Sequence, residues 1–327
     1  MSYITNGKME YLSTVELVKD ILKMIFPERK RKTEKYGEFI GVPSGFVSLD
    51  KLISGWKKSD LIVFAARPSI GKTSLVLRMA RNIRIESGMP VLFITLETTA
   101  SQLLMKLLSM ECDLPLNKIQ TGILNHEERS VIKEKCAELS FKDFNFEDRY
   151  RDLKDIVDVC QSFKKKNGNG VIFVDNLQQL INSSKIYSTR DHEVGDIVRE
   201  LKSLAKELDV PIIVTSQLNR GVETRAGNEK RPQLADLRDS GEIENVADIV
   251  CFIHRPEYYK IYEDENGNSL RGIAQIIVAK HRSGAVGDVN LRFISENAKF
   301  VNLNEGSDMT NSDEDDFNAD SSTPFPF

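Results

Sequence analysis

The stretch AARPSIGKT, residues 65–73, has the residue types of a phosphate-binding loop. Such loops follow the pattern G-x-x-x-x-G-K-[ST]: backbone N–H groups surround phosphate oxygens, the lysine reaches the outer phosphates, and the hydroxyl helps to hold Mg²⁺. Ala66 stands at the first glycine position, where a tight turn is needed more than a positive φ, so we expect alanine to be tolerated. The sequence therefore predicts a site for ATP and Mg²⁺ formed by Arg67, Pro68, Ser69, Ile70, Gly71, Lys72, Thr73 and Ser74.

Two acidic residues end other apolar segments, VIFVD at Asp175 and VLFITLE at Glu97. Hydrolysis of ATP needs one carboxylate near Mg²⁺ and another group that orients the attacking water. We assign the metal role to Asp175 together with Thr73, and the activation of water to Glu97. Both acids have a structural alternative, since Asp175 could cap a turn and Glu97 could favour the dipole of a following helix.

Three further groups of polar residues are candidates. The segment PIIVTSQ ends in Gln217, an amide that could sense the terminal phosphate. In AKHRSGAVGD, Lys280 and Arg282 have no obvious local carboxylate partner, so they are either surface cations or groups that complete an ATP site on a neighbouring subunit. The segment that follows Gln217 could follow a nucleic-acid backbone or form an exposed charged loop. Its cations are Arg220, Arg225, Lys230, Arg231 and Arg238.

Alternating strands and helices are predicted to position these groups. From Leu61 onward, short apolar runs rich in β-branched residues are typical of parallel strands buried on both faces. The runs cover residues 61–66, 91–96, 171–175 and 211–217, and the helices expected between and after them cover residues 72–86, 100–111, 126–139, 153–166 and 191–208. This alternation predicts an α/β fold with a doubly wound, mostly parallel sheet. After Asp248, strand-like segments follow one another without helices, so we expect an antiparallel extension of the sheet.

We expect three regions along the 327 residues. Residues 1–40 comprise an amphipathic helix over 11–26, which starts with a capping box of Ser13 and Glu16, and a charged linker. Residues 41–304 form the ATPase domain. Residues 305–327 form an acidic, disordered tail. The net charge of −4 does not argue against a nucleic-acid partner, because residues 306–327 hold six Asp and Glu and no Lys or Arg.

Several classes of protein are disfavoured by the composition. No apolar run approaches the roughly 20 residues needed to span a bilayer, and the first residues lack the pattern of a signal peptide, so we expect a cytoplasmic protein without a membrane partner. The four cysteines, which form no C-x-x-C pair, do not indicate a zinc site or a disulfide framework. The cysteines are Cys112, Cys136, Cys160 and Cys251.

Taken in order, several segments resemble the C-terminal ATPase domain of the DnaB-type replicative DNA helicases, which has a RecA-like fold. They are GVPSGFVSLDKLISGW, AARPSIGKT, LETTASQLLMKLLS, LNKIQTG, VDNLQQL, TSQLNRGVETR, LADLRDSGEIENVADIV and AKHRSGAVGDVNLRF. In that family the loop reads A-R-P-S-[MI]-G-K-T, so Ala66 is a family feature. The resemblance implies catalytic roles for Lys72, Glu97 and Gln217, and it implies that Lys280 and Arg282 enter the neighbouring subunit's ATP site in a ring hexamer. It also assigns contacts with the backbone of single-stranded DNA to Arg238, Asp239 and Gly241.

The sequence departs from the family in two places. The family usually has Tyr-Leu-Gln-Leu after the strand acid, where this chain has Asn176, Leu177, Gln178 and Gln179. The family's N-terminal helical collar has no counterpart, and residues 11–26 match only the linker helix that docks on the adjacent subunit, which puts binding of primase through a collar in doubt. The acidic tail ending in Thr-Pro-Phe-Pro-Phe is similar to the partner-recruiting tails of bacterial single-stranded-DNA-binding proteins.

These observations predict an ATP-dependent hexameric DNA helicase that moves 5′ to 3′ on single-stranded DNA and unwinds duplex. A helicase loader, a primase or a replisome protein associated with single-stranded DNA would be its partner in a bacterial, phage or mobile-element replicon. Two alternatives remain open from the sequence. One is another RecA-like DNA-dependent ATPase of the recombinase or strand-exchange type, and the other is a module that binds ATP and DNA and recruits partners without unwinding.

Overall fold

The computed structural model describes residues 40–139, 143–225, 230–237 and 241–303, together with the backbone of residues 2–5 and 8–11. The chain divides into two compact units, Met1–Phe39 and Ile40–Phe327. In the first unit, β1 (Ser2–Thr5) and β2 (Lys8–Tyr11) pair as an antiparallel hairpin. Of the helix predicted over 11–26, only residue 11 is described, and it is the last residue of β2. The rest of that prediction lies outside the described part of the chain, as do the predicted charged linker and the tail predicted over 305–327.

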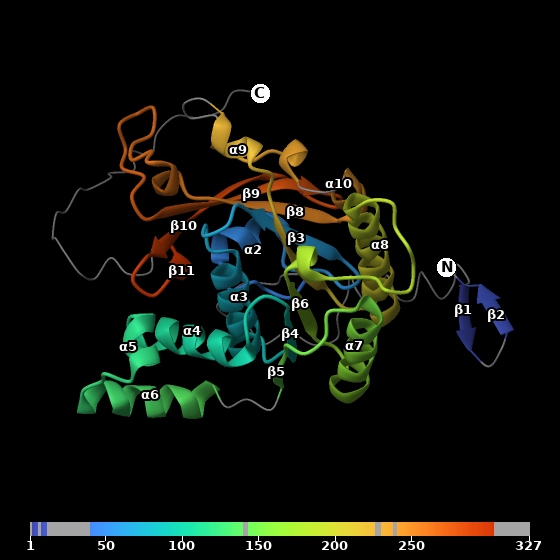
Figure 1. Cartoon of the computed structure of the whole chain (residues 1–327), viewed down its shortest axis with the longest axis horizontal. Coiled ribbons are helices and arrows are strands. Elements are labelled where there is room, and N and C mark those ends of the chain that lie inside the picture. The colour runs from blue at the N-terminus through green and yellow to red at the C-terminus, as the bar shows by residue number, and fades with distance from the viewer. Residues whose placement is uncertain are drawn as a thin grey trace, which may run out of the picture. The chain divides into compact units, whose positions relative to one another are not determined.

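The second unit is built on one nine-stranded sheet (Figure 1). In spatial order its strands are β11 (Lys299–Asn302), β10 (Gly287–Ile294), β9 (Ile273–His281), β8 (Ile249–His254), β3 (Leu61–Ala66), β7 (Ile212–Gln217), β6 (Val171–Asp175), β4 (Val91–Thr95) and β5 (Phe144–Glu147). The strands from β8 to β5 are all parallel, and β9, β10 and β11 are antiparallel to their neighbours. The predicted α/β class is confirmed, but the antiparallel part begins one strand later than the change in composition, since β8 runs parallel to β3.

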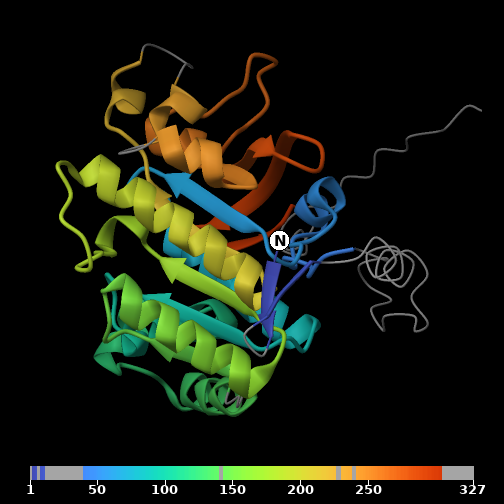
Figure 2. The same ribbon diagram turned by 90° about the vertical axis from the view of Figure 1, so that its right-hand side faces the viewer.

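Helices cover both faces of this sheet. On one face, α7 (Leu153–Asn167), α8 (Arg190–Leu208) and α10 (Gly241–Val246) pack in one apolar core, and Figure 2 shows α7 and α8 lying over this face of the sheet. On the other face, α2 (Val47–Ile53), α3 (Lys72–Glu86) and α4 (Ala100–Cys112) pack in a second core with β9, β10 and β11. The shorter or peripheral helices are α5 (Leu116–Thr121), α6 (His126–Leu139), α9 (Gly221–Thr224), η1 (Leu177–Gln179), η3 (Leu234–Asp236) and η4 (Pro256–Tyr259).

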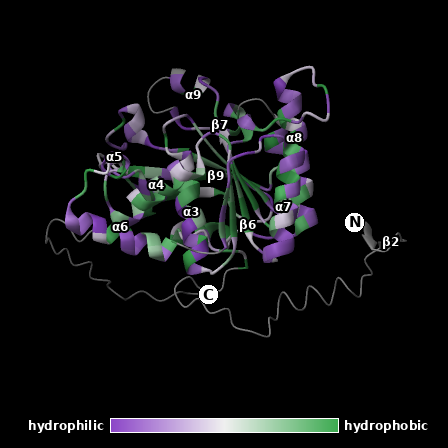
Figure 3. Ribbon diagram, turned by 60° about the horizontal axis from the view of Figure 1, so that its bottom comes forward, coloured by the Kyte–Doolittle hydropathy of each residue, from purple (hydrophilic) through white to green (hydrophobic). Residues whose placement is uncertain are grey.

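The central strands are apolar because both of their faces are covered. Every residue of β3, β4, β6 and β8 is buried, and in Figure 3 these strands are mostly green while the helices around them mix purple with green. Burial on both faces explains why these strands appear in the sequence as continuous apolar runs. Among the described residues, none of the helices has the length and hydropathy needed to cross a membrane.

The last residue of β8, His254, is a buried histidine. It is 5% exposed, its ring stacks on that of Tyr259 at 5.5 Å between centroids, and its Nδ1 has no hydrogen-bond partner among the described residues. Burial lowers the pKa of His254 from 6.5 to about 4; the positive charge of Arg231 lowers it further, and Asp288 acts in the opposite direction. The folded chain therefore keeps this imidazole neutral under mildly acidic conditions.

This burial makes folding stability depend on pH. Between pH 6.5 and pH 4 the unfolded chain binds a proton at this histidine that the folded chain does not bind, so stability falls as the pH falls. We expect His254 to make the free energy of unfolding ~2 kcal/mol smaller at pH 5 than at pH 8. Urea unfolding followed by circular dichroism should show that His254→Phe loses less stability between pH 8 and pH 5 than the wild type, whereas His126→Phe on the exposed face of α6 should behave as wild type. An equal loss in all three proteins would contradict this assignment.

Candidate nucleotide-binding site

The loop predicted to bind phosphate connects β3 with α3. Gly71 is the N-cap of α3 with φ 113°, and no side chain caps the first N–H groups of this 15-residue helix. Ser69 also has a positive φ, 64°, so the backbone turns sharply twice before the helix begins. Unpaired N–H groups at a helix N-terminus, together with the helix dipole, form a site that favours anions. The loop thus has the backbone geometry that a chain of phosphates requires.

Glycine is required at position 71 by space as well as by conformation. A Cβ atom built on Gly71 would lie 3.0 Å from Cε2 and Cζ of the Phe300 ring. Phe300 in β11 packs edge-on against Phe293 in β10, with ring centroids 4.9 Å apart. The guanidinium of Arg255 lies over the Phe293 ring at 3.6 Å and donates to the carbonyl of Ile70 at 3.4 Å. The antiparallel extension therefore packs against the phosphate loop and supports it.

Two cations of the loop have different surroundings. Lys72 Nζ donates to the carbonyl oxygens of Ala66 at 3.1 Å and Arg67 at 3.3 Å. Burial lowers the pKa of Lys72, and the charges of Asp175 and Glu97 oppose that effect. Its hydrogen bonds go to carbonyls rather than to a carboxylate, so Lys72 lies where an anionic ligand would pair with it. The Arg67 side chain is buried and turns toward α9, where it donates to Glu223 and to the carbonyl of Leu218, both at 2.8 Å.

Asp175 connects the loop to the rest of the sheet. It is the last residue of β6 and is 1% exposed. Its Oδ2 accepts from Thr73 Oγ1 at 2.6 Å, and its Oδ1 accepts from Thr215 Oγ1 in β7. Carboxylate and hydroxyl oxygens are ligand types that Mg²⁺ prefers. The pair that the sequence assigned to the metal is thus brought together, and its chemistry fits Mg²⁺ bound with a nucleotide.

Glu97 and Gln217 lie at the same edge of the sheet as the loop. Gln217 ends β7 directly opposite Ala66, and Glu97 follows β4, whose Thr95 pairs with Asp175. The Glu97 side chain is exposed and accepts a hydrogen bond from Asn176 Nδ2 at 2.7 Å. Because parallel strands end at a common edge, residues separated by more than a hundred positions in the chain meet there.

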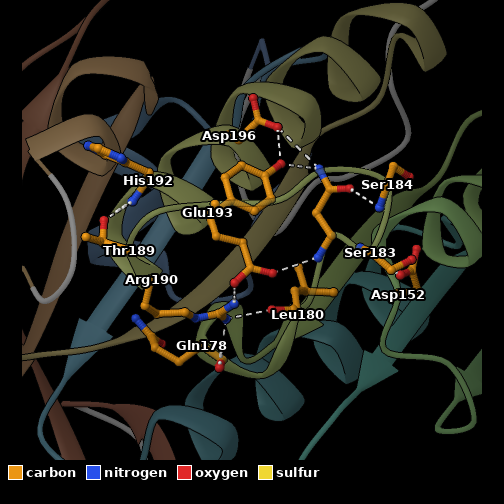
Figure 4. A network of polar contacts seen from close by, with 12 residues as sticks. Asp152, Gln178, Leu180, Ser183, Ser184, Thr189, Arg190, His192, Glu193 and Asp196 are labelled. Carbon is orange, nitrogen blue, oxygen red and sulfur yellow. Dashed lines mark hydrogen bonds and ion pairs between the residues drawn. The ribbon is translucent and has the colours of Figure 1, made fainter.

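A polar network holds the segment that follows β6 (Figure 4). Arg190, at the start of α8, donates to the carbonyls of Gln178 and Leu180 and to the carboxylate of Glu193. Gln178 in turn accepts from the backbone N–H of Gln217 at 3.0 Å and donates to Ser216 Oγ at 2.9 Å. The network therefore fixes the end of β7, where the predicted phosphate sensor lies.

Lys106 of α4 lies close enough to this site to feel the charge of Asp175, and the sequence analysis did not single it out. It lies between the buried residues Leu103 and Leu107 of the helix. Burial lowers the pKa of Lys106, and the nearby charge of Asp175 raises it. The available signal was a lysine within the apolar face of an amphipathic helix, a position at which a charged residue needs a partner.

Lys280 and Arg282 are not brought to this edge. Lys280 pairs with Val250 near the start of β8, and β8 runs parallel to β3 with Ile249 opposite Ile62. Val250 is opposite Val63, so this position is four residues, or roughly 13 Å along the strand, from Arg67, where the phosphate loop begins. Both side chains donate to the carbonyl of Asn245 at the end of α10. The two cations therefore lie at the opposite edge of the sheet from this chain's own loop.

Of the residues assigned to DNA, Arg238 and Asp239 lie outside the described residues, and Gly241 is exposed as the first residue of α10. Two other cations of the basic segment that follows Gln217 form ion pairs, Arg225 with Asp236 and Arg231 with Asp288. These two arginines hold the loops of the segment together and are poor candidates for contacts with a nucleic-acid backbone.

Comparison with known proteins gives consistent matches over the second unit of the chain, which contains the nine-stranded sheet. A family model described as DnaB-like helicase C terminal domain matches residues 41–302. Replicative DNA helicase DnaC of Bacillus subtilis is 39% identical over 292 residues, which cover 89% of this chain and 63% of that protein. Replicative DNA helicase DnaB of Geobacillus stearothermophilus is 40% identical over 287 residues, which cover 88% of this chain and 62% of that protein. The chain thus spans less than two thirds of the length of these relatives.

Two solved structures are similar to this fold. One, described as an ATPase domain, has a TM-score of 0.80 and 33% sequence identity, with 90% of this chain and 100% of that chain covered. A structure of a DnaB-like replicative helicase and its interactions with primase has a TM-score of 0.76 and 32% identity, with 90% of this chain and 67% of that chain covered. The RecA-like character predicted for the sheet is confirmed by these neighbours.

We expect Gly71→Ala to weaken binding of a fluorescent ATP analogue roughly tenfold, because a left-handed φ at a residue with a Cβ costs about 1–2 kcal/mol before the contact with Phe300 is counted. Gly88→Ala is the matched control. Gly88 also has a positive φ, 65°, but a Cβ there would meet no atom within 4 Å. Fluorescence titration of both variants tests this prediction, and wild-type affinity in Gly71→Ala would contradict it.

Proposed function

The chain belongs to the family of DnaB-like helicase C-terminal domains, and we propose that it is an ATP-dependent DNA helicase. In this proposal it assembles as a hexameric ring on single-stranded DNA, moves 5′ to 3′ and separates duplex ahead of it. One observation supports ATP use above all others: Lys72, Thr73 with Asp175, and Glu97 converge on a single edge of the sheet. The relatives that share this domain are replicative DNA helicases.

The residues at the loop edge of the sheet have separate roles in the hydrolysis of ATP. Bound ATP with Mg²⁺ supplies the transferable phosphoryl group and a cation that neutralises its charge. The loop N–H groups and Lys72 would hold the phosphates, and Thr73 and Asp175 would hold Mg²⁺. Glu97, which is exposed at the same edge, orients the attacking water and accepts its proton. Gln217, fixed through its backbone by Gln178, responds to the terminal phosphate.

Lys280 and Arg282 act on the ATP site of the adjacent subunit. Their place at the edge opposite their own loop supports this role, because a ring in which each subunit contacts the next by different surfaces brings opposite edges together. Arg282 is held for this task by Asp248, whose Oδ1 lies 3.5 Å from Arg282 NH1 and whose backbone carbonyl accepts from Arg282 N at 2.9 Å. A guanidinium fixed in this way stabilises the charge of the transferring phosphoryl group.

Helix α10 provides a physical connection between the DNA segment and these cations. It begins at Gly241, next to the segment to which the family resemblance assigns DNA contacts, and its last carbonyls, of Glu244 and Asn245, accept from Lys280 and Arg282. In this proposal, a displacement of Gly241 on binding DNA would pass through α10 to Lys280 and Arg282, the groups that complete the neighbour's ATP site. This arrangement supports an ATPase that DNA stimulates.

Partners are proposed by analogy with the relatives. The similar helicase of known structure is described with its interactions with primase, and we propose a primase or a loader as a partner of this chain in a bacterial cytosol. The three residues assigned to single-stranded DNA, Arg238, Asp239 and Gly241, remain a proposal of the same kind.

Replacing the proposed base tests the function directly. Glu97→Gln keeps the size and hydrogen bonding of the side chain but cannot accept the proton, so we expect the ATPase rate to fall about 100-fold or more and ATP-dependent unwinding of a forked duplex to disappear. Binding of a fluorescent ATP analogue should stay within a few-fold of wild type. Glu127→Gln, on an exposed position of α6, is the matched control. Wild-type unwinding by Glu97→Gln, or no ATP-dependent unwinding by the wild type, would overturn the proposal.

Mixing two inactive variants tests the role of Arg282 between subunits. Lys72→Ala lacks a working loop and Arg282→Ala lacks the cation, so each alone should hydrolyse ATP at least about 100-fold more slowly than wild type. In mixed rings, an Arg282→Ala subunit beside a Lys72→Ala subunit restores one complete site. Random mixing at equal amounts should therefore recover up to about a quarter of the wild-type ATPase rate.

The control is a mixture of Lys72→Ala with Glu97→Gln. The proposal places both of these residues in the same subunit's site, so no arrangement of such a mixture contains an intact site and no activity should return. If the mixture with Arg282→Ala also stays inactive after subunit exchange, Arg282 does not act between subunits.

A further inference from the structure

The carboxylate of Glu97 has a specific neighbour, the amide of Asn176. Asn176 Nδ2 donates to Glu97 Oε2 at 2.7 Å, and this is the only hydrogen bond to the Glu97 side chain among the described residues. The two side chains differ in exposure, because Glu97 is exposed whereas Asn176 is 6% exposed. A buried amide thus holds an exposed carboxylate.

The register of the sheet accounts for this contact. Strands β4 and β6 are neighbours with Thr95 opposite Asp175, and Leu96 N donates to the carbonyl of Asp175 at 2.8 Å. Asn176 follows Asp175 directly and Glu97 follows Leu96 directly, so the two residues leave the sheet side by side. The backbone of Asn176 is fixed further by its carbonyl, which accepts from Gln179 N at 3.1 Å. The amide is therefore held in place before it meets the carboxylate.

The orientation of the amide is determined by Glu97. Asn176 Oδ1 is buried and has no hydrogen-bond partner among the described residues. An unpaired buried acceptor is unfavourable. The side-chain amide can lie in two orientations that exchange Nδ2 and Oδ1, and it adopts the one with the better hydrogen bonds. The opposite orientation would place Oδ1 against the Glu97 carboxylate, where two acceptors would repel each other. The contact with Glu97 is thus the interaction that keeps Asn176 in its present orientation.

We propose that Asn176 is a positioning residue for Glu97: its amide holds one carboxylate oxygen so that the other is directed at the attacking water. The proposal rests on the role given to Glu97 above. Lys72 and the Thr73–Asp175 pair act on the nucleotide and metal, whereas Asn176 acts only through Glu97. Loss of Asn176 should therefore lower the rate of hydrolysis and leave nucleotide binding unchanged, because an unheld carboxylate spends less time in the reactive geometry.

The test uses the full chain with Asn176→Leu, which removes the amide at similar size, and Asn176→Asp, which keeps the shape but replaces the donor with an oxygen. We expect kcat for ATP hydrolysis to fall roughly 10- to 100-fold in both variants, with KM for ATP and the affinity for a fluorescent ATP analogue within about twofold of wild type. Asn297→Leu is a closely matched control. Asn297 is also 6% exposed, donates from Nδ2 to a carboxylate, that of Asp113, at 3.0 Å, and has a buried Oδ1 that is unpaired among the described residues.

A double-mutant cycle separates positioning from a general structural effect. In a Glu97→Gln background, the change Asn176→Leu should reduce the single-turnover rate by less than about twofold, because the group that Asn176 positions has already been replaced. An equal reduction in both backgrounds, a raised KM, or the same loss of kcat in Asn297→Leu would overturn the proposal for Asn176. If Glu97→Gln alone hydrolyses ATP at the wild-type rate, the role of Glu97 itself fails, and that outcome is distinct from the others.

Discussion

The site depends on the hydrogen bonds that satisfy the buried carboxylate of Asp175. A carboxylate that is 1% exposed is strongly unfavourable unless it is paired. Thr73 at the start of α3 and Thr215 in β7 supply these hydrogen bonds, so the loop, β6 and β7 are joined at one point. Hydrogen bonds to charged groups contribute about 1.5–3 kcal/mol each, which is enough to fix the helix that presents the phosphate loop. The positions of Lys72 and of the loop N–H groups follow from this junction.

The antiparallel strands serve the two edges of the sheet in different ways. At the loop edge, Phe300 and Phe293 fill the space beside Gly71 and support the phosphate loop. At the other edge, the end of β9 carries Lys280 and Arg282, held by Asp248 and by the carbonyls that end α10. One structural extension thus supports the phosphate loop and also carries the two cations that we propose to act on a neighbour's ATP site.

Much of the fold follows from the sequence by simple rules. The strands that end in Asp175 and Gln217 are buried on both faces and therefore appear as continuous apolar runs, and α3 and α6 have the predicted bounds. Single-sequence patterns could not place β8 beside β3, because an apolar strand looks the same whether its neighbour is parallel or antiparallel. The short strand β5 and helix α2 were missed, since four to seven residues carry too little periodicity to be distinguished from a loop.

The meeting of Asp175, Glu97 and Gln217 at one edge of the sheet could be predicted because each lies at or just after the end of a parallel strand, while their roles stay a proposal. Asn176 was not predicted as a site residue, because its relevance comes from a contact between neighbouring strand ends that leaves no mark on the spacing of residues. The position of Arg282 at the opposite edge of the sheet could not be predicted either, because it depends on how β9 pairs with β8.

An electron cryomicroscopy structure of the chain with a non-hydrolysable ATP analogue, Mg²⁺ and single-stranded DNA tests the central claim most directly. The account predicts a closed ring of six copies in which the phosphate loop of one subunit binds the nucleotide and Arg282 of the next subunit lies within hydrogen-bonding distance of its terminal phosphate. A nucleotide enclosed by residues of one subunit alone, or an open filament without Arg282 at the phosphate, would contradict it.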